Sequence, residues 1–371
     1  MVKKQSDDFT AKEIERQYEG HVTLIKASEL ENPIGNSSGS YSLDYDLGIP
    51  FPEGGIVEIF GPESSMKTTL GLSVIANALK AGKKCAFINM ERSINRSHLD
   101  KISALKPFLE KNSNSFTIIN ADSGEKALNV MKLFAEQNAG SVIFLDSVDA
   151  CIPEAVLSGE IGDNRVGNHA KLMSDAMRRL IDTAYRKKSL LIFSNQIRSK
   201  IIAYGNPNES TGGHALRFYS HQRIELQKPG KQQLMTDSDG NVTGVLMRYT
   251  IRKNKYQPGG QEGTIPILYN HGIFAELELI EMCLKFGILA FGGKGGKQVV
   301  LPSILPDKSD FSTDTKTMSK LNAARYLRID RDLYALIDQK YRDFLKNIGD
   351  SGVTDIADIS EDEGEDEVQD S

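Results

Sequence analysis

A strand–loop–helix segment around residue 60 constrains the fold of this chain more than any other feature. Residues 54–60 (GGIVEIF) are an apolar run of strand length, and residues 69–82 have helical periodicity with one apolar stripe that ends at Gly82. The loop between them matches the phosphate-binding pattern G-x-x-x-x-G-K-[ST] except at one position. Backbone N–H groups in such a loop, at the start of a helix, bind phosphate. The residues expected to surround a nucleotide here are Gly61, Pro62, Glu63, Ser64, Ser65, Met66, Lys67, Thr68 and Thr69.

The exception is Met66, which stands where the pattern has its second glycine. Glycine there lets the backbone pass close to phosphate without a Cβ atom. If the position requires a positive φ, methionine costs about 1 kcal/mol. Two interpretations follow: an intact loop whose methionine packs against apolar neighbours, or a loop with weakened nucleotide binding. We favour the intact loop, because methionine adapts to irregular surroundings, and expect any effect to fall on hydrolysis.

Apolar strands alternate with helices through the first two thirds of the chain. A helix over 122–137 opens with an expected capping box of Asp122 and Glu125, and a long helix is expected over about 167–188. Strands that are apolar throughout are typical of a parallel sheet covered on both faces, so the predicted class is α/β. The further buried strands are expected at 84–90, 116–122, 141–148 and 190–196.

Polar side chains stand where these strands end, which is where ligands bind in an open α/β sheet. Lys67 offers a charge to the outer phosphates, and Thr68 offers a hydroxyl to Mg²⁺. Asp146 ends another buried strand and is expected to support that metal. Glu91 is a candidate base for activating water, and Gln196 is placed to sense the γ-phosphate. One acid at a strand end often only caps a loop, but the whole set beside a phosphate loop favours an ATP and Mg²⁺ site.

The remaining chain divides into further segments. Residues 1–31 are expected to form an N-terminal helix and a strand (22–29), and residues 32–275 an ATPase core. Residues 276–347 are expected to form a small α/β domain with a glycine-rich hairpin (286–301) and a final helix (331–347). Late strands of the core are expected at 217–227, 244–253 and 263–270, with a hairpin turn at 239–241.

Charge is distributed unevenly. The chain has 50 acidic and 45 basic residues, and ten of the acids follow Lys346, so the body carries 40 acidic against 45 basic residues. A mildly basic body with an acidic tail (348–371), expected to be disordered, suggests a polyanionic partner. The polar N-terminus lacks a secretory pattern, no apolar run has membrane-spanning length, and Cys85, Cys151 and Cys283 are widely spaced. These features favour a cytoplasmic protein with core cysteines.

Taken together, these motifs resemble the RecA recombinase family over roughly residues 22–300. The resemblance rests on the loop and its strand (GGIVEIFGPESSMKTTL), on CAFINMERS around Glu91, on IFLDSV around Asp146, and on RKNK (252–255). It also rests on the stretch FSNQIRSKIIAYGNPNESTGGHALRFYSHQR (193–223) and on the acidic tail. Several divergences suggest a distant member, encoded by a bacterium or a phage.

The resemblance implies a helical filament on single-stranded DNA, with ATP at each subunit interface and duplex DNA as a second substrate. It gives Lys67, Thr68, Asp146, Glu91 and Gln196 the roles assigned above. Residues 10–29 would pack on an adjacent subunit, and Lys294 and Lys297 would collect duplex DNA. The implied adenine contacts are Asn95 and His98, where the family has an acid and an aromatic. The residues implied at the subunit interface are Lys253 and Lys255, acting in trans on ATP, with Arg217 and Phe218.

Two segments are candidates for contact with DNA. Lys171, Ser174 and Arg178 are spaced to share one helix face that follows a glycine-bearing loop including Val166, although such a face is more often simply solvated. The second segment is long and glycine-rich, and its apolar residues could stack on or wedge between bases. By resemblance, Ile201 would be the wedge. The candidate residues of this segment are Arg198, Ser199, Lys200, Ile201, Gly212, Gly213 and His214.

Three functions fit these features. The first is a DNA-dependent ATPase that forms recombinase filaments and catalyses homologous pairing and strand exchange. The second is a hexameric helicase of the same fold, which the paired lysines of KNK (253–255) disfavour. The third is a non-hydrolysing DNA-binding filament, which would follow from Met66. Fold analogy alone does not decide between them.

Overall fold

The computed structural model describes residues 13–14, 16–18, 24–109, 114–158, 167–199, 208–210, 214–236, 239–304 and 310–351. The chain divides into two compact units, residues 1–34 and 35–371. In the first unit, residues 13–14 and 16–17 are helical and Ala27–Glu29 form a short 3-10 helix. The strand expected over 22–29 is absent from its described part, 24–29. A strand needs a partner for its backbone N–H and C=O groups, and none of the described residues pairs with this segment.

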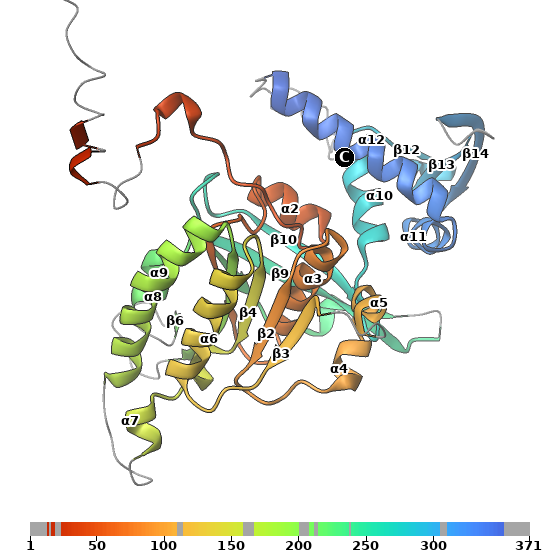
Figure 1. Cartoon of the computed structure of the whole chain (residues 1–371). Coiled ribbons are helices and arrows are strands. Elements are labelled where there is room, and N and C mark those ends of the chain that lie inside the picture. Colours follow the sequence, from red (N-terminus) through yellow and green to blue (C-terminus); the bar gives the residue numbers. More distant parts are fainter. Residues whose placement is uncertain are drawn as a thin grey trace, which may run out of the picture. The chain divides into compact units, whose positions relative to one another are not determined.

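The second unit is built on one large sheet (Figure 1). Its strand order is β11-β10-β9-β7-β1-β5-β4-β2-β3. The pairs from β7 to β3 are parallel, and those from β7 to β11 are antiparallel. The strands on this path are β1 (Ile56–Gly61), β2 (Cys85–Asn89), β3 (Phe116–Ile119), β4 (Val142–Asp146), β5 (Leu190–Ser199), β7 (Gln222–Leu226), β9 (Val242–Asn254), β10 (Glu262–Leu268) and β11 (Gly272–Ile273). Two short strands lie off it: β6 (Asn208–Ser210) pairs with β5, and β8 (Leu234–Thr236) pairs with β9.

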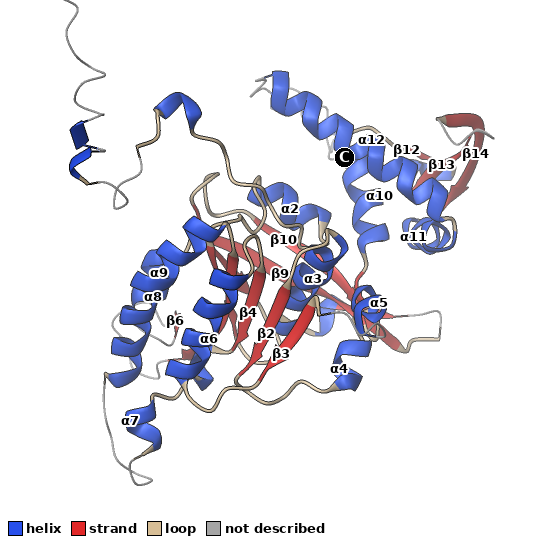
Figure 2. Cartoon of the chain, viewed as in Figure 1, coloured by secondary structure: helices blue, strands red, loops and turns tan. Residues whose placement is uncertain are grey.

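Helices cover both faces of this sheet, as the apolar strands predict (Figure 2). One core lies between the sheet and α3 (Lys67–Lys80), and includes Val57 and Ile59 of β1. The other lies beneath α6 (Gly124–Gln137), α8 (Asn168–Lys187) and α9 (His214–Tyr219). The α/β class and the mostly parallel sheet are therefore confirmed. The remaining core helices are α2 (Tyr41–Leu47), α4 (Arg96–Asp100), α5 (Lys106–Leu109) and α7 (Glu154–Leu157).

Two local expectations were wrong. The cap of α6 is Ser123, whose Oγ accepts from the Lys126 backbone N–H at 3.2 Å, and not Asp122. Residues 217–219 belong to α9 and not to a strand, because Leu216 is buried in the core beneath the helix. The strand expected over 217–227 is limited to β7.

The C-terminal part forms its own core against α2. It contains α10 (Ala275–Lys285), α11 (Lys320–Ile329), α12 (Arg331–Ser351) and an antiparallel sheet of β12 (Ala290–Gly292), β13 (Gln298–Ile304) and β14 (Phe311–Met318). Helix α12 continues through Ser351, into the segment expected to be an acidic tail. No helix among the described residues has the length and apolar character needed to span a membrane. The three cysteines are buried and free.

Candidate functional site

The phosphate loop leads from β1 into α3 with two residues in the left-handed region. Ser64 has a φ of 60°, and Met66 has φ 65° and ψ 25°. Met66 is the N-cap of α3, and its carbonyl accepts from the Leu70 N–H at 3.0 Å. Its partly buried side chain packs against the core beside α3, and the Thr69 Oγ1 donates to its sulfur at 3.8 Å. The backbone thus has the glycine-like conformation, and the methionine side chain has packing partners.

Lys67 is held against the loop by backbone carbonyls. Its Nζ donates to the carbonyl oxygens of Gly61 at 3.0 Å and Pro62 at 2.7 Å. Burial lowers the pKa of this lysine, and the carboxylates of Asp146, Glu91 and Glu63 act in the opposite direction. The hydrogen bonds of this partly dehydrated ammonium group go to neutral oxygens, so an approaching anion would stabilise its charge. Lys67 is therefore suited to bind phosphate.

Thr68 and Asp146 meet although 78 residues separate them. The Thr68 Oγ1 donates to the Asp146 Oδ2 at 2.6 Å. Strand β5 lies between β1 and β4, so the turn after β1 brings Thr68 across the end of β5 to Asp146. Asp146 is 3% exposed, and burial raises its pKa, while the hydrogen bond from Thr68 lowers it. A hydroxyl and a carboxylate in contact form a hard oxygen donor set, which fits Mg²⁺.

Glu91 joins this group from the end of β2. The backbone N–H groups of Met90 and Glu91 donate to the Asp146 carbonyl at 2.8 and 3.2 Å. The Glu91 Oε1 accepts from the Ser147 Oγ at 2.5 Å and from the Gln196 Nε2 at 3.4 Å. The structure therefore brings together Thr68, Asp146, Glu91 and Gln196, although β5 continues to Ser199 and does not end at Gln196 as expected. Ser147 was missed from the sequence, where only its position directly after Asp146 could have indicated it.

A second cluster lies where β9 ends beside α9. The Lys253 Nζ donates to the carbonyls of Arg217 at 3.0 Å and Phe218 at 2.8 Å. Burial lowers the pKa of Lys253, and so do the nearby charges of Lys255 and Arg223. Phe218 is 73% exposed. This is an accumulation of positive charge beside an exposed aromatic ring, which an anionic partner would stabilise.

The expected base contacts lie on α4. Asn95 is the N-cap of this helix, and its Oδ1 accepts from the His98 backbone N–H at 3.1 Å. Both side chains are exposed. Since the carbonyl oxygen of Asn95 is committed to the cap, its Nδ2 group remains as a donor.

The residues expected to contact DNA are only partly described. On α8, Lys171 and Arg178 are exposed and Ser174 is half-buried, while Met173 and Met177 face the core. Arg198 and Ser199 lie in the part of β5 that pairs with β6, and His214 begins α9. The expected residues outside the described ranges are Val166, Lys200, Ile201, Gly212 and Gly213.

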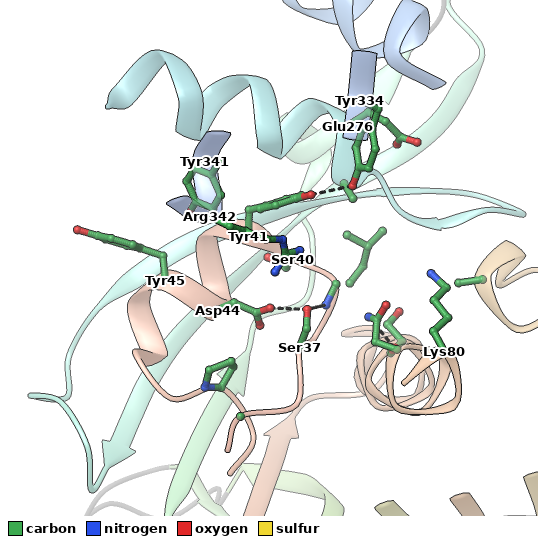
Figure 3. A pocket seen from close by; sticks show the side chains of 18 of the residues that line it. Ser37, Ser40, Tyr41, Asp44, Tyr45, Lys80, Glu276, Tyr334, Tyr341 and Arg342 are labelled. Atoms are coloured by element: carbon green, nitrogen blue, oxygen red, sulfur yellow. Dashed lines mark hydrogen bonds between the residues drawn. The ribbon is translucent and has the colours of Figure 1, made fainter. Parts of the chain in front are cut away.

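A separate cavity of about 1200 Å³ lies at the other end of α3, where Lys80 lines it (Figure 3). Tyr41 of α2 forms part of its wall, and its hydroxyl is bonded to that of Tyr334 at 2.7 Å and donates to Asp338 at 2.7 Å. Next to this wall Glu278 is buried, and its Oε1 accepts from the hydroxyls of Ser40 at 2.7 Å and Ser42 at 2.5 Å. The cavity contains none of the residues expected to bind the nucleotide.

With this geometry established, comparison with known proteins gives a clear assignment. A family model described as the RecA N-terminal domain matches residues 6–274. The chain belongs to the RecA family. The Protein RecA of Marinobacter nauticus is 37% identical over 336 residues, covering 90% of each chain. That of Acidiphilium cryptum is 37% identical over 348 residues, covering 92% of this chain and 94% of the relative.

A further RecA relative, from Wolbachia of Drosophila simulans, is 35% identical over 356 residues and covers 95% of this chain and 94% of its own. Among solved structures, the crystal structure of the RadB recombinase matches 64% of this chain and 98% of its own, with 20% identity and a TM-score of 0.47. Similarity to RecA proteins thus extends well beyond the N-terminal family domain, into the C-terminal part of this chain.

Proposed function

We propose that this RecA-family chain is a DNA-dependent ATPase that forms a helical filament on single-stranded DNA and catalyses homologous pairing and strand exchange in recombination and repair. The observation that carries the proposal is the meeting, behind the phosphate loop, of groups from the ends of β2 and β4 and from β5. Thr68 contacts Asp146 at 2.6 Å, and Glu91 contacts Ser147 and Gln196 beside them. Such a set of hydroxyl, carboxylate and amide groups is what ATP hydrolysis requires.

In this proposal the loop backbone and Lys67 bind the phosphates of ATP, and Thr68 and Asp146 hold Mg²⁺. The metal, when bound, neutralises phosphate charge and orients the phosphate oxygens. Glu91 orients the attacking water, since it is the carboxylate of the cluster that remains exposed. The Gln196 Nε2 lies 3.4 Å from the Glu91 Oε1, and Gln196 stands two residues before the segment expected to contact DNA, so it is suited to link phosphate with DNA.

The cluster at β9 supports an assembly in which one subunit completes the site of the next. Lys253 and Lys255 would reach the ATP of the neighbouring subunit, and the exposed Phe218 would contact that subunit. The lowered pKa of Lys253 supports this assignment, because a neighbour's phosphates would relieve the repulsion from Lys255 and Arg223. Asn95 and His98 would contact the base, and the exposed face of α8 and the segment 198–214 would contact DNA.

Phosphate release with and without single-stranded DNA tests the proposed activity. We expect stimulation by DNA in the wild type, and no turnover in the Lys67→Ala variant. Met66→Gly should behave like the wild type. If the wild type shows no turnover and the Met66→Gly variant hydrolyses ATP, the result would instead support a non-hydrolysing filament. Electron microscopy with DNA and a slowly hydrolysed ATP analogue should show filaments, and closed rings would favour the helicase alternative.

A further inference from the structure

A charged residue lies inside β1, a strand in which every residue is buried. Glu58 is in the middle of β1, between Val57 and Ile59, and is 0% exposed. A buried carboxylate is costly unless it is paired and hydrogen-bonded. Its Oε1 accepts from the Asn195 Nδ2 of β5 at 2.9 Å, and its Oε2 accepts from the Arg223 Nε of β7. Each oxygen of this one carboxylate is therefore bonded to a different neighbouring strand.

The two partners lie next to residues of the proposed ATP site. Asn195 directly precedes Gln196, and Glu58 lies three residues before Gly61, where the phosphate loop starts. Arg223 stands opposite Lys253 in the β7–β9 register. Its guanidinium also lies over the Phe60 ring, with its central carbon 4.4 Å from the ring centroid, so it is fixed from two sides. Glu58 thus joins the strand that leads to the phosphate loop to the strand that carries Gln196 and to Arg223, the register partner of Lys253.

The same contacts reach both ends of the segment expected to bind DNA. The first residues of that segment (198–214) are the last residues of β5, and its last residue, His214, begins α9. At one end, the Asn195 side chain connects β5 to Glu58 by its hydrogen bond. Lys253 holds α9 by donating to the carbonyls of Arg217 and Phe218. A shift at either end must therefore be accommodated by the strands that meet at Glu58.

We propose that Glu58 is a positioning residue that couples the phosphate site to both ends of the DNA segment. Because its two oxygens are bonded to separate strands, the carboxylate cannot follow β5 without straining its bond to β7. Stability alone does not account for the arrangement, since replacing a buried ion pair with apolar side chains is often neutral or stabilising. The assignment rests on the proposed function only in the roles given to Gln196 and Lys253.

The first test uses Asn195→Ala, which removes the hydrogen bond between β5 and the Glu58 carboxylate and leaves the Glu58–Arg223 pair and the β1–β5 backbone pairing in place. The matched control is Ser189→Ala, which removes a buried hydroxyl immediately before β5 begins; this hydroxyl is bonded to the Ser141 Oγ at 3.1 Å and donates to the carbonyls of Asn138 and Lys187 at 3.5 Å each. Hydrogen exchange is followed in the full-length protein with and without a slowly hydrolysed ATP analogue. In the wild type and the control, nucleotide should protect the amides of both the phosphate loop and α9. In Asn195→Ala, protection should remain in the loop and be lost in α9.

The second test is the ratio of phosphate release with and without single-stranded DNA. Asn195→Ala should lower this ratio at least tenfold, while the Kd of the ATP analogue stays within about threefold of the wild-type value, a difference of less than 1 kcal/mol. The double variant Glu58→Gln/Arg223→Met, which leaves no unpaired charge, should fold and show the same loss.

Equal protection of α9 in Asn195→Ala and Ser189→Ala would overturn the proposal, as would a wild type whose α9 does not respond to nucleotide. The exchange experiment needs no hydrolysis. A wild type without DNA-stimulated turnover would therefore refute the proposed function, while α9 protection would still decide the role of Glu58.

Discussion

Met66 allows the cost of its backbone conformation to be separated from the value of its side chain. The comparison is between Met66→Gly and Met66→Ala, both of which remove the same packing against the core beside α3. Alanine keeps the strain of φ 65°, whereas glycine does not. That strain is worth about 1 kcal/mol in the unfolding free energy. We therefore expect the glycine variant to be more stable than the alanine variant by about 1 kcal/mol.

The wild type should lie close to the glycine variant. Fully burying a methionine stabilises by about 1.5–3 kcal/mol, so a partly buried one contributes about 1 kcal/mol, which offsets the strain. Because Met66 already has the glycine-like backbone, Met66→Gly should also leave the Kd for ATP within about threefold of the wild-type value.

Urea unfolding of the nucleotide-free protein, followed by circular dichroism, measures these differences. The control is Lys80, at the exposed end of the same helix in ordinary right-handed conformation. There glycine should be less stable than alanine by about 1 kcal/mol, the opposite sign. If Met66→Ala equals or exceeds Met66→Gly in stability while the Lys80 pair behaves as stated, the assignment of strain to Met66 is wrong.

Three further predictions concern other parts of the molecule. Burial raises the pKa of Glu278 to about 8, against weaker opposing effects of the hydrogen bonds from Ser42 and Ser40. The folded protein therefore keeps a proton on this carboxyl group that the unfolded chain releases. The contribution of Glu278 to the free energy of unfolding is therefore lost as pH rises from about 4.5 to 8. The melting temperature of Glu278→Gln relative to the wild type should therefore increase between pH 6 and pH 8, and a constant difference would contradict this protonation state. Asn95→Asp keeps one oxygen for the helix cap and adds a second oxygen that can accept from the base. This variant should raise the preference for ATP over GTP about fivefold in competition binding, which corresponds to one hydrogen bond of about 1 kcal/mol. An unchanged ratio would show that the base does not contact residue 95. Lys253→Ala and Glu91→Gln should each abolish turnover alone, and mixing them should restore part of it if Lys253 acts on a neighbour's ATP, whereas no recovery would argue against action in trans.

The sequence predicts the parts of this fold that follow from local patterns. The sequence predicts the strand over 141–148 from its apolar run and the helix after Thr68 from its 3.6-residue periodicity, because length and periodicity are enough to identify such elements. The residues of the proposed ATP site were predicted from the loop motif and from their positions near strand ends, and the structure brings Thr68 into contact with Asp146 and Glu91 into contact with Gln196. Lys67 is the clearest case, since both its charge and its place in the loop are visible in the motif.

What was missed depends on contacts made across the fold. Residues 217–219 contain an aromatic pair that favours a strand by propensity, but the burial of Leu216 selects a helix. Glu58 seemed to be an ordinary member of an apolar strand, because its partner Arg223 lies 165 residues away. The sequence also could not decide which residue caps α6, because Asp122 and Ser123 are adjacent and both residue types favour the N-cap position.

The pairing of β5 with β6 has a consequence for how this protein can diversify. Ser199 stands opposite Asn208 in the register, so the residues on either side of 200–207 are held by one pairing. A segment whose two ends are fixed at one place can change its length and composition without displacing the strands that hold it. Segments taken from other relatives can therefore be grafted between Ser199 and Asn208, and under the proposed function differences in DNA preference should be transferred with them.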